Sequence, residues 1–210
     1  MKPLGIFGGT FDPIHYGHLR LAVEVLEHFD LEQLVLLPNK APPHRTQPLA
    51  SAAHRLAMTQ LAVAGVTGLA VDGRELQRAG ASYSVDTLQE LAAEHPGQPL
   101  LFVMGMDSLL SFTSWHQWQQ ILALASLAVC CRPGHCLDPA TLHPALASRL
   151  SEQAITGPGQ IVTVTSTELA ISATDIRQRI GAGQRSDFLL PPAVADYIRH
   201  HRLYRAPAAS

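Results

Sequence analysis

The 210-residue sequence has little net charge and no marked excess of either sign. Its 15 basic and 17 acidic residues give a formal charge of −2. A protein that binds a nucleic-acid polymer through its general electrostatics carries a broad basic surface, so this composition argues against DNA or RNA as a partner. Any anionic ligand has to be bound by a few local groups.

The sequence also lacks a run of about 18 consecutive apolar residues, the length that a membrane-spanning helix needs. Its first residues, MKPLGIFGG, reach a pair of glycines too early for a secretory signal peptide. We therefore expect a cytoplasmic protein with no membrane partner.

Cysteine is scarce, and the three that occur, Cys130, Cys131 and Cys136, are clustered in CCRPGHC. An odd and clustered set does not suit a disulfide framework, so we expect reduced thiols. With His135 nearby and 11 histidines in the chain, a metal cluster or a metal-binding protein is an alternative. The C-x2-C spacing typical of zinc sites is missing, however, and the sequence leaves the role of the cluster open.

Hydrophobic residues make up 47% of the chain, enough for one sizeable core. We expect a single domain over residues 1–205 and a flexible tail over 206–210. Short apolar runs that are typical of buried strands recur at 4–7, 33–38, 69–71, 99–105, 126–131 and 161–165. Because helical patterns separate them, the sequence predicts an α/β fold: a doubly wound, mostly parallel sheet with helices on both faces.

The helical patterns also carry start signals. Ser172 or Thr174 can cap one helix, and Pro191 or Pro192 suits the first turn of the last one. The predicted helices run from about residue 17 to 29 and over 51–63, 82–95, 114–124, 172–183 and 191–202.

The stretch FGGTFDPIHYGHLRLA joins the first strand to the first helix. A glycine turn into a helix N-terminus offers N–H groups and a positive dipole end to phosphate, and His15 and His18 can donate to phosphate oxygens. The motifs of dinucleotide-binding folds and P-loops are absent, and the spacing does not suit a zinc pair. Either histidine alone could be a helix cap or a surface group, Asp12 could belong to a turn, and Gly8 and Gly9 could be turn residues.

The tetrapeptide HYGH at 15–18 resembles the signature of the HxGH nucleotidyltransferase superfamily. Five more motifs follow in the order found in bacterial nicotinate-nucleotide adenylyltransferases: PNKAPPHR at 38–45, SYSVDTL at 82–88, GMDSL at 105–109, RPG at 132–134 and ISATDIR at 171–177. The resemblance spans nearly the whole chain and implies a Rossmann-like nucleotidyltransferase fold.

The resemblance implies transfer of AMP from ATP to nicotinate mononucleotide, giving deamido-NAD and pyrophosphate in NAD biosynthesis, with Mg²⁺ accompanying ATP. Direct attack by the mononucleotide phosphate needs no covalent enzyme intermediate. Alternatives are an HxGH adenylyltransferase for nicotinamide mononucleotide or phosphopantetheine, and a nucleotide-binding regulator without turnover. The oligomeric state is left open, a homo-oligomer included.

The resemblance also implies roles for individual residues, with His15, His18 and Arg177 catalytic and no residue holding a metal. The implied ATP-binding residues are Gly8, Gly9, Thr10, Phe11, His15, His18, Gly105, Asp107, Ile171, Ser172, Thr174 and Arg177. Those implied for the mononucleotide are Thr10, Asn39, Lys40, Arg45, Tyr83, Ser84, Thr87, Asp107, Trp115 and Arg132.

The side-chain chemistry of a few of these residues suits the implied roles, but most of them also have a plainer structural alternative. Hydroxyls and N–H groups at a helix start, with the fork of Arg177, suit a triphosphate, but a cap and a solvated arginine are the plainer alternatives. Selection of nicotinate needs donors such as Ser84 and no opposing carboxylate nearby. The ring of Trp115 suits a pyridine. Alternatively, Trp115 and Trp118 are three residues apart on one predicted helix face and could both pack in the hydrophobic core. Asp107 could simply cap a helix, and Thr87 could be an ordinary helix residue.

Overall fold

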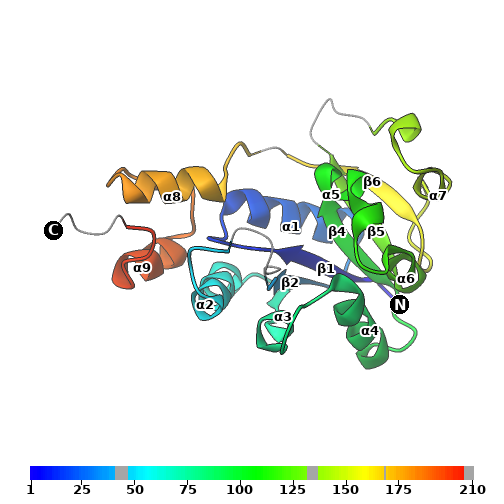
Figure 1. The fold of residues 1–210 in the computed structure, drawn as a ribbon, viewed down its shortest axis with the longest axis horizontal. Helices are drawn as coiled ribbons and strands as arrows, with labels where there is room; N and C mark the ends of the chain where they lie inside the picture. The colour runs from blue at the N-terminus through cyan, green and yellow to red at the C-terminus, as the bar shows by residue number, and fades with distance from the viewer. Residues whose placement is uncertain (41–46, 132–136, 168, 206–210) are drawn as a thin grey trace.

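The computed structural model describes residues 1–40, 47–131, 137–167 and 169–205. A sheet of six strands runs through the molecule, with helices on both sides (Figure 1). The strands are β1 (Leu4–Gly9), β2 (Gln33–Pro38), β3 (Leu69–Val71), β4 (Leu100–Gly105), β5 (Ala125–Cys131) and β6 (Ile161–Thr165). Every predicted strand is present, with bounds within two residues of those expected.

The strand order is β3-β2-β1-β4-β5-β6, and each neighbouring pair is parallel. The predicted doubly wound sheet is thus confirmed. The chain moves outward from β1 in both directions, first to β2 and β3 and later to β4, β5 and β6. Ligands of open parallel sheets bind where the strand order reverses, beyond the carboxyl ends of the strands. In this fold that position is the end of β1, next to β4.

Most of the predicted helices are also found, and the short ones are additional. The helices are α1 (Tyr16–His28), α2 (Ala52–Val63), α3 (Arg74–Gln77), α4 (Ser84–Glu94), α5 (Met106–Leu110), α6 (Trp118–Leu124), α7 (Pro144–Ala147), α8 (Ala173–Gly181) and α9 (Pro192–His200), with 3₁₀ turns at Phe112–Ser114 and Pro139–Thr141. Ser172 caps α8, and Pro192 opens α9 after Pro191, as expected.

One helix start was predicted wrongly. The pattern placed Trp115 and Trp118 together on a helix from residue 114, but α6 begins at Trp118. Gln117 has a left-handed φ of 50°, which interrupts the helical turn before it. The two tryptophans therefore do not share a helix face, and Trp115 lies in a turn.

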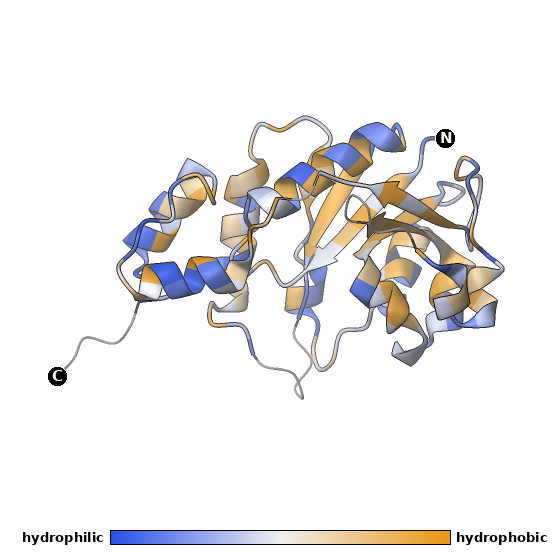
Figure 2. Ribbon diagram, turned by 90° about the horizontal axis from the view of Figure 1, so that it is seen from above, coloured by the Kyte–Doolittle hydropathy of each residue, from blue (hydrophilic) through white to orange (hydrophobic). Residues whose placement is uncertain are grey.

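The core is divided by the sheet into two layers. Leu4 and Ile6 face one layer and Phe7 the other, because side chains alternate along a strand. Helices α4, α5 and α6 cover the first layer, and α1, α2, α8 and α9 cover the second. Figure 2 shows apolar strands between helices whose outer surfaces are largely polar. Within the described ranges no helix has the length and apolar character to cross a membrane.

Candidate active site

The loop after β1 is built around a buried phenylalanine. Phe11 has a left-handed φ of 48° and is 1% exposed. A Cβ on Gly9 would lie 2.6 Å from the Phe11 ring. Only glycine therefore leaves room for this ring to pack against the main chain at residue 9. Gly8 is different, since a Cβ there would meet only ordinary contacts. Both glycines belong to β1, so the alternative that they are turn residues is wrong.

His15 and His18 lie against each other at the start of α1. Their rings are stacked with centroids 3.7 Å apart, and the His18 ring meets Phe11 edge-on at 5.1 Å. His15 occupies the N-cap position, but its side chain makes no cap hydrogen bond, and it is buried. The alternative that it is only a helix cap or a surface group is therefore wrong.

Neither buried Nδ1 atom of these two histidines has a hydrogen-bond partner in the described part of the chain. Buried polar side-chain atoms are nearly always paired, so two neighbouring exceptions indicate a place where a ligand completes the bonding. They lie at the carboxyl end of β1, where the fold directs a ligand.

Burial sets the charge of both imidazoles. It lowers the pKa of His15 to about 4, and burial together with the nearby charge of His15 lowers the pKa of His18 to about 3. With these values both rings of the free protein are neutral at pH 7, and a neutral imidazole has one N–H donor and one acceptor nitrogen. Positive charge in the site has to come from elsewhere.

Gly17, the glycine of HYGH, allows the start of α8 to approach these histidines closely. A Cβ on Gly17 would lie 3.0 Å from the His15 ring and 3.5 Å from the carbonyl oxygen of Ile171. The chain that leads into α8 thus passes close beside α1. Ser172 is the N-cap of α8, and its Oγ accepts from the Asp175 N–H at 3.1 Å. The capping alternative for Ser172 holds, and its hydroxyl proton is still available to a ligand.

Arg177 is a cation held beside the loop after β1. Its Nη1 donates to the carbonyl oxygen of Asp12 at 2.7 Å, and its Nη2 donates to Thr174 Oγ1 at 3.2 Å. The side chain is 23% exposed. Arg177 is therefore held against the loop after β1, and the alternative of a solvated surface charge does not apply.

Asp12 was missed as a functional candidate. Its Oδ2 accepts from Leu49 N–H at 2.8 Å, and its Oδ1 accepts from Ala50 N–H at 3.1 Å and from the Tyr204 hydroxyl at 2.7 Å. Asp12 begins the cis peptide to Pro13, so the turn interpretation is correct but incomplete. No local pattern could show these contacts, because every partner is distant in the sequence.

Arg55, which the sequence analysis did not single out, contacts the same loop from α2. It is 3% exposed, and its Nη1 donates to the carbonyl oxygen of Thr10 at 2.7 Å. Thr10 itself is exposed at the tip of the loop.

A small pocket of about 70 Å³ lies on the other face of β1. Four predicted acceptor residues line it: Asn39, Ser84, Thr87 and Trp115, with Gly8 at the strand end. The buried Oδ1 of Asn39 has no partner in the described part of the chain. Tyr83 precedes α4, and no side-chain cap hydrogen bond forms there, so none occupies Ser84 Oγ. Four of the ten residues predicted for the acceptor are thus brought together in this pocket.

The same pocket contains a carboxyl group that the sequence analysis excluded. Glu75 is 8% exposed and accepts from Thr87 Oγ1 at 2.9 Å, while Arg78 Nη1 donates to that hydroxyl at 3.2 Å. Burial raises the pKa of Glu75, and the Thr87 bond and the Arg78 charge oppose the rise. The expectation of a pocket without a carboxylate nearby is wrong, and the Thr87 hydroxyl is occupied within the protein.

The other predicted residues are spread around these two sites. Lys40 Nζ donates to the Arg78 carbonyl oxygen at 2.8 Å, and the exposed ring of Tyr83 lies 4.3 Å from that of His116. Gly105 and Asp107 are exposed where β4 leads into α5.

Several predictions fall outside the described residues, namely those for Arg45, Arg132, His135, Cys136 and the tail at 206–210. In the part that is described, no group of three histidine, cysteine, aspartate or glutamate side chains could hold a metal ion. Burial, with the neighbouring Cys131, raises the pKa of the Cys130 thiol to about 12, so this thiol is not a nucleophile.

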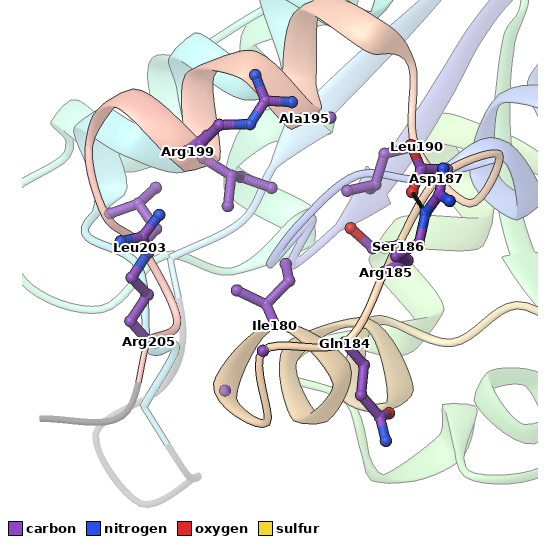
Figure 3. Close-up of a pocket in the computed structure, with 13 residues that line it drawn as sticks. Ile180, Gln184, Arg185, Ser186, Asp187, Leu190, Ala195, Arg199, Leu203 and Arg205 are labelled. Atoms are coloured by element: carbon purple, nitrogen blue, oxygen red, sulfur yellow. Dashed lines mark hydrogen bonds and ion pairs between the residues drawn. The ribbon is translucent and has the colours of Figure 1, made fainter.

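A larger cavity of about 540 Å³ lies between α8 and α9 (Figure 3). None of the predicted site residues lines it. Its rim carries the Arg185–Asp187 ion pair at 2.9 Å, and Leu203 and Arg205 line it on either side of Tyr204. The larger of these two cavities is therefore not the candidate active site, since the unpartnered histidine atoms lie at the end of β1.

The sequence model of the Cytidylyltransferase-like family matches residues 6–179. The chain is 49% identical over 211 residues to a probable nicotinate-nucleotide adenylyltransferase of Pseudomonas aeruginosa, covering 98% of this chain and 99% of that protein. It is 46% identical over 220 residues to a probable nicotinate-nucleotide adenylyltransferase of Aeromonas salmonicida, covering 97% and 98% of the two chains.

The fold has a solved counterpart in the Plasmodium falciparum nicotinic acid mononucleotide adenylyltransferase complexed with NaAD. The TM-score is 0.75 at 17% identity, with 97% of this chain and 98% of that chain covered. The sequence relatives, which match over almost their whole length, decide the assignment. The chain belongs to the nicotinate-nucleotide adenylyltransferase family.

Proposed function

We propose that this protein transfers the AMP group of ATP to nicotinate mononucleotide and releases pyrophosphate, forming deamido-NAD in NAD biosynthesis. The observation that carries the proposal is the stacked pair His15 and His18. Their buried Nδ1 atoms have no partner in the described part of the chain and lie at the strand end beside α8 and Arg177. This arrangement suits a polyphosphate, and the relatives are named for this reaction.

ATP binds, in this proposal, across the starts of α1 and α8. Both helix N-termini favour anions, Arg177 adds a guanidinium, and Ser172 and Thr174 add hydroxyls. Gly8, Gly9, Thr10 and the main chain of Phe11 form the floor, since the Phe11 ring is buried. Ile171, Gly105 and Asp107 lie toward the nucleoside, and the Ile171 N–H is already engaged by the Leu169 carbonyl oxygen at 2.6 Å.

The pyridine end of nicotinate mononucleotide enters the pocket on the opposite face of β1, since about 70 Å³ is too small for the whole nucleotide. Ser84 donates to the pyridine carboxylate, Trp115 stacks on the ring and Asn39 contacts the nucleotide through its unpartnered oxygen. Glu75 lies in the same pocket, but burial raises its pKa and Thr87 donates to it, so it opposes the pyridine carboxylate less than a free glutamate would. The roles of Lys40, Tyr83, Thr87, Arg45 and Arg132 stay predictions from the family motifs. The two sites flank one strand end, which brings the two phosphates together at the switch point of the sheet.

The reaction is a direct displacement. A phosphate oxygen of the mononucleotide forms a bond to the α-phosphorus of ATP, the bond from that phosphorus to the bridging oxygen breaks, and pyrophosphate takes the electron pair. The attacking phosphate has a second pKa of roughly 6 and is largely ionised at pH 7, so no general base is required. His15 and His18 donate to oxygens that gain charge, and Arg177 neutralises charge on the triphosphate.

Mg²⁺ is proposed to accompany ATP and to neutralise phosphate charge. The described residues offer no cluster of metal ligands, and the oxygens of Asp12 already accept three hydrogen bonds. The residues present therefore do not fit a protein-held ion, and the ion would be bound through the triphosphate.

Pyrophosphate release tests the proposal with the purified protein, ATP and each of three acceptors: nicotinate mononucleotide, nicotinamide mononucleotide and phosphopantetheine. We expect release with nicotinate mononucleotide and a matching amount of deamido-NAD by chromatography. The His18→Ala variant controls for contaminating activity. Release with another acceptor alone reassigns the substrate, and ATP binding without release from any acceptor supports a regulator. Stoichiometric zinc in the purified protein would favour the metal-binding alternative.

Three further points belong to the same proposal. Residues 1–205 act as one domain, because helices from both ends of the chain cover one sheet and meet at the site. ATP and the mononucleotide are the partners, with no polymer involved. The cytoplasmic location and the oligomeric state stay predictions that fractionation and light scattering can test.

A further inference from the structure

Tyr204 reaches the site from the far end of the chain. Its hydroxyl donates to Asp12 Oδ1 at 2.7 Å, although 192 positions separate the two residues. The ring packs against the apolar layer that holds α1, α8 and α9. Burial and the neighbouring Asp12 raise the pKa of Tyr204 well above its usual range, so the hydroxyl keeps its proton and stays a donor.

The chain after α9 is held in an uncommon conformation to make this contact. Arg202 and Tyr204 have left-handed φ values of 54° and 62°. Residues with a Cβ adopt this region at a cost in free energy and keep it where the surroundings hold it in place. Leu203 N–H donates to the Ile198 carbonyl oxygen at 3.0 Å, which fixes the turn. The turn aims Tyr204 at the loop after β1.

Asp12, which accepts from Tyr204, also contacts Arg177. The main-chain carbonyl oxygen of Asp12 accepts from Arg177 Nη1 at 2.7 Å, and its carboxylate lies 3.9 Å from the same nitrogen. Both carboxylate oxygens are engaged, so rotation of the side chain would break bonds to the main chain at Leu49 or Ala50. The position of the Arg177 guanidinium thus depends on how firmly Asp12 is held.

We propose that Tyr204 is a positioning residue of the active site, whose hydroxyl holds Asp12 so that the Asp12 carbonyl orients the Arg177 guanidinium toward the triphosphate of ATP. The inference rests on the proposed function, because it needs Arg177 to act on ATP. It adds a residue that lies outside the motifs of the family resemblance. Tyr204 touches neither substrate in this arrangement and acts through Asp12.

Tyr204→Phe removes the hydroxyl and keeps the ring in the apolar layer. Tyr197→Phe is a matched control, since Tyr197 lies on the neighbouring helix α9 and its hydroxyl also makes one side-chain hydrogen bond, to His54 Nδ1 at 2.9 Å. We expect kcat to fall about 10-fold in Tyr204→Phe, the lower end of the change that loss of one hydrogen bond to a charged group produces, because Tyr204 acts through Asp12. We expect less than about a 2-fold change in Tyr197→Phe, and an unchanged KM for nicotinate mononucleotide in both variants.

A double-mutant cycle with Arg177→Ala separates positioning from general loosening of the fold. If Tyr204 acts through Arg177, Tyr204→Phe causes less than about a 2-fold further loss once Arg177 is alanine. Rates are measured well below the unfolding midpoint of each variant. Full kcat in Tyr204→Phe, an equal loss in the Arg177→Ala background, or an equal loss in Tyr197→Phe would each overturn the inference.

The cycle also distinguishes this inference from the proposed function. If Arg177→Ala retains full activity, the role of Arg177 fails whatever Tyr204 does. If Arg177→Ala loses activity and Tyr204→Phe does not, the inference alone fails. If the unmodified protein gives no pyrophosphate, the proposed function fails first.

Discussion

Replacement of His18 by alanine tests the centre of the proposed chemistry. His18 offers a neutral N–H from a ring that is wedged between His15 and Phe11, so the donor is oriented before ATP binds. A preorganised donor to a developing oxyanion contributes about 2.7–4 kcal/mol, equivalent to a 10²- to 10³-fold effect on kcat. We expect at least a 10²-fold lower kcat with a modest change in KM for either substrate. The assay is steady-state pyrophosphate release.

His28→Ala is the matched control. His28 lies in the last turn of the same helix, is exposed and is far from the strand end that carries His18. Its substitution removes a histidine from α1 without touching the site, so kcat should stay within about 2-fold of the unmodified protein. A comparable loss in both variants would mean that α1 itself is perturbed.

The pH dependence of the His18→Ala effect tests the charge state of the ring. Because the pKa of His18 is lowered to about 3, the ring is neutral in the free enzyme at both pH 6 and pH 8. The ratio of kcat/KM for ATP between unmodified protein and variant should then be the same at both pH values, since ionisation of the substrates cancels in the ratio. A near-unmodified kcat, or a ratio that is tenfold larger at pH 6, would refute a neutral donor at this position.

Three further predictions concern other parts of the site. Ser84→Ala should raise KM for nicotinate mononucleotide about tenfold, since a hydrogen bond to a charged group is lost, and should leave KM for ATP unchanged; equal shifts for both substrates would contradict the acceptor pocket. Gly17→Ala should lower kcat several-fold because its Cβ would press on the His15 ring from 3.0 Å, whereas Gly157→Ala, with nothing within 4 Å, should not; kinetics of the two variants decide this. The free energy of unfolding should fall as pH drops from 6.5 toward 4, by about 3 kcal/mol for His15, because its pKa is lower in the folded chain than in the unfolded one and protons favour the unfolded state. Urea titrations should show a shallower fall in His15→Gln, and an unchanged slope would count against the lowered pKa.

The strands were predictable because a strand buried on both faces reads as a short apolar run whatever its neighbours are. The β1 run, LGIF, and the β2 run, QLVLLP, are of this kind. Helices of four or five residues carry no such signal, because one turn cannot show a 3.6-residue period. That is why α3, α5 and α7 were not predicted. The sequence extended α6 backward through Trp115 for another reason, since the left-handed φ of Gln117 leaves no mark in the apolar pattern.

The candidate site could be proposed from the sequence where one segment carries its own chemistry. His15, His18 and the start of α8 lie in local motifs with a clear role for helix N-termini. Asp12 and Glu75 were not predictable, because an Asp-Pro turn and a glutamate in RELQ are ordinary solvent-exposed patterns. Only the sheet order and the return of the chain end to β1 bury these carboxyl groups, and sequence spacing contains neither.

The small net charge of the chain agrees with a candidate site that has few cationic side chains. A protein with a formal charge of −2 has to bind two anionic nucleotides, and in the proposed function it does so with helix N-termini, neutral imidazoles and the guanidinium of Arg177. Two neutral donors hold the ground-state triphosphate less tightly than two imidazoliums would. As charge moves onto the leaving pyrophosphate, the same donors form stronger hydrogen bonds, so their contribution is greatest in the transition state. If His15 and His18 act as proposed and stay neutral when ATP is bound, their low pKa values keep binding energy for the step in which charge develops.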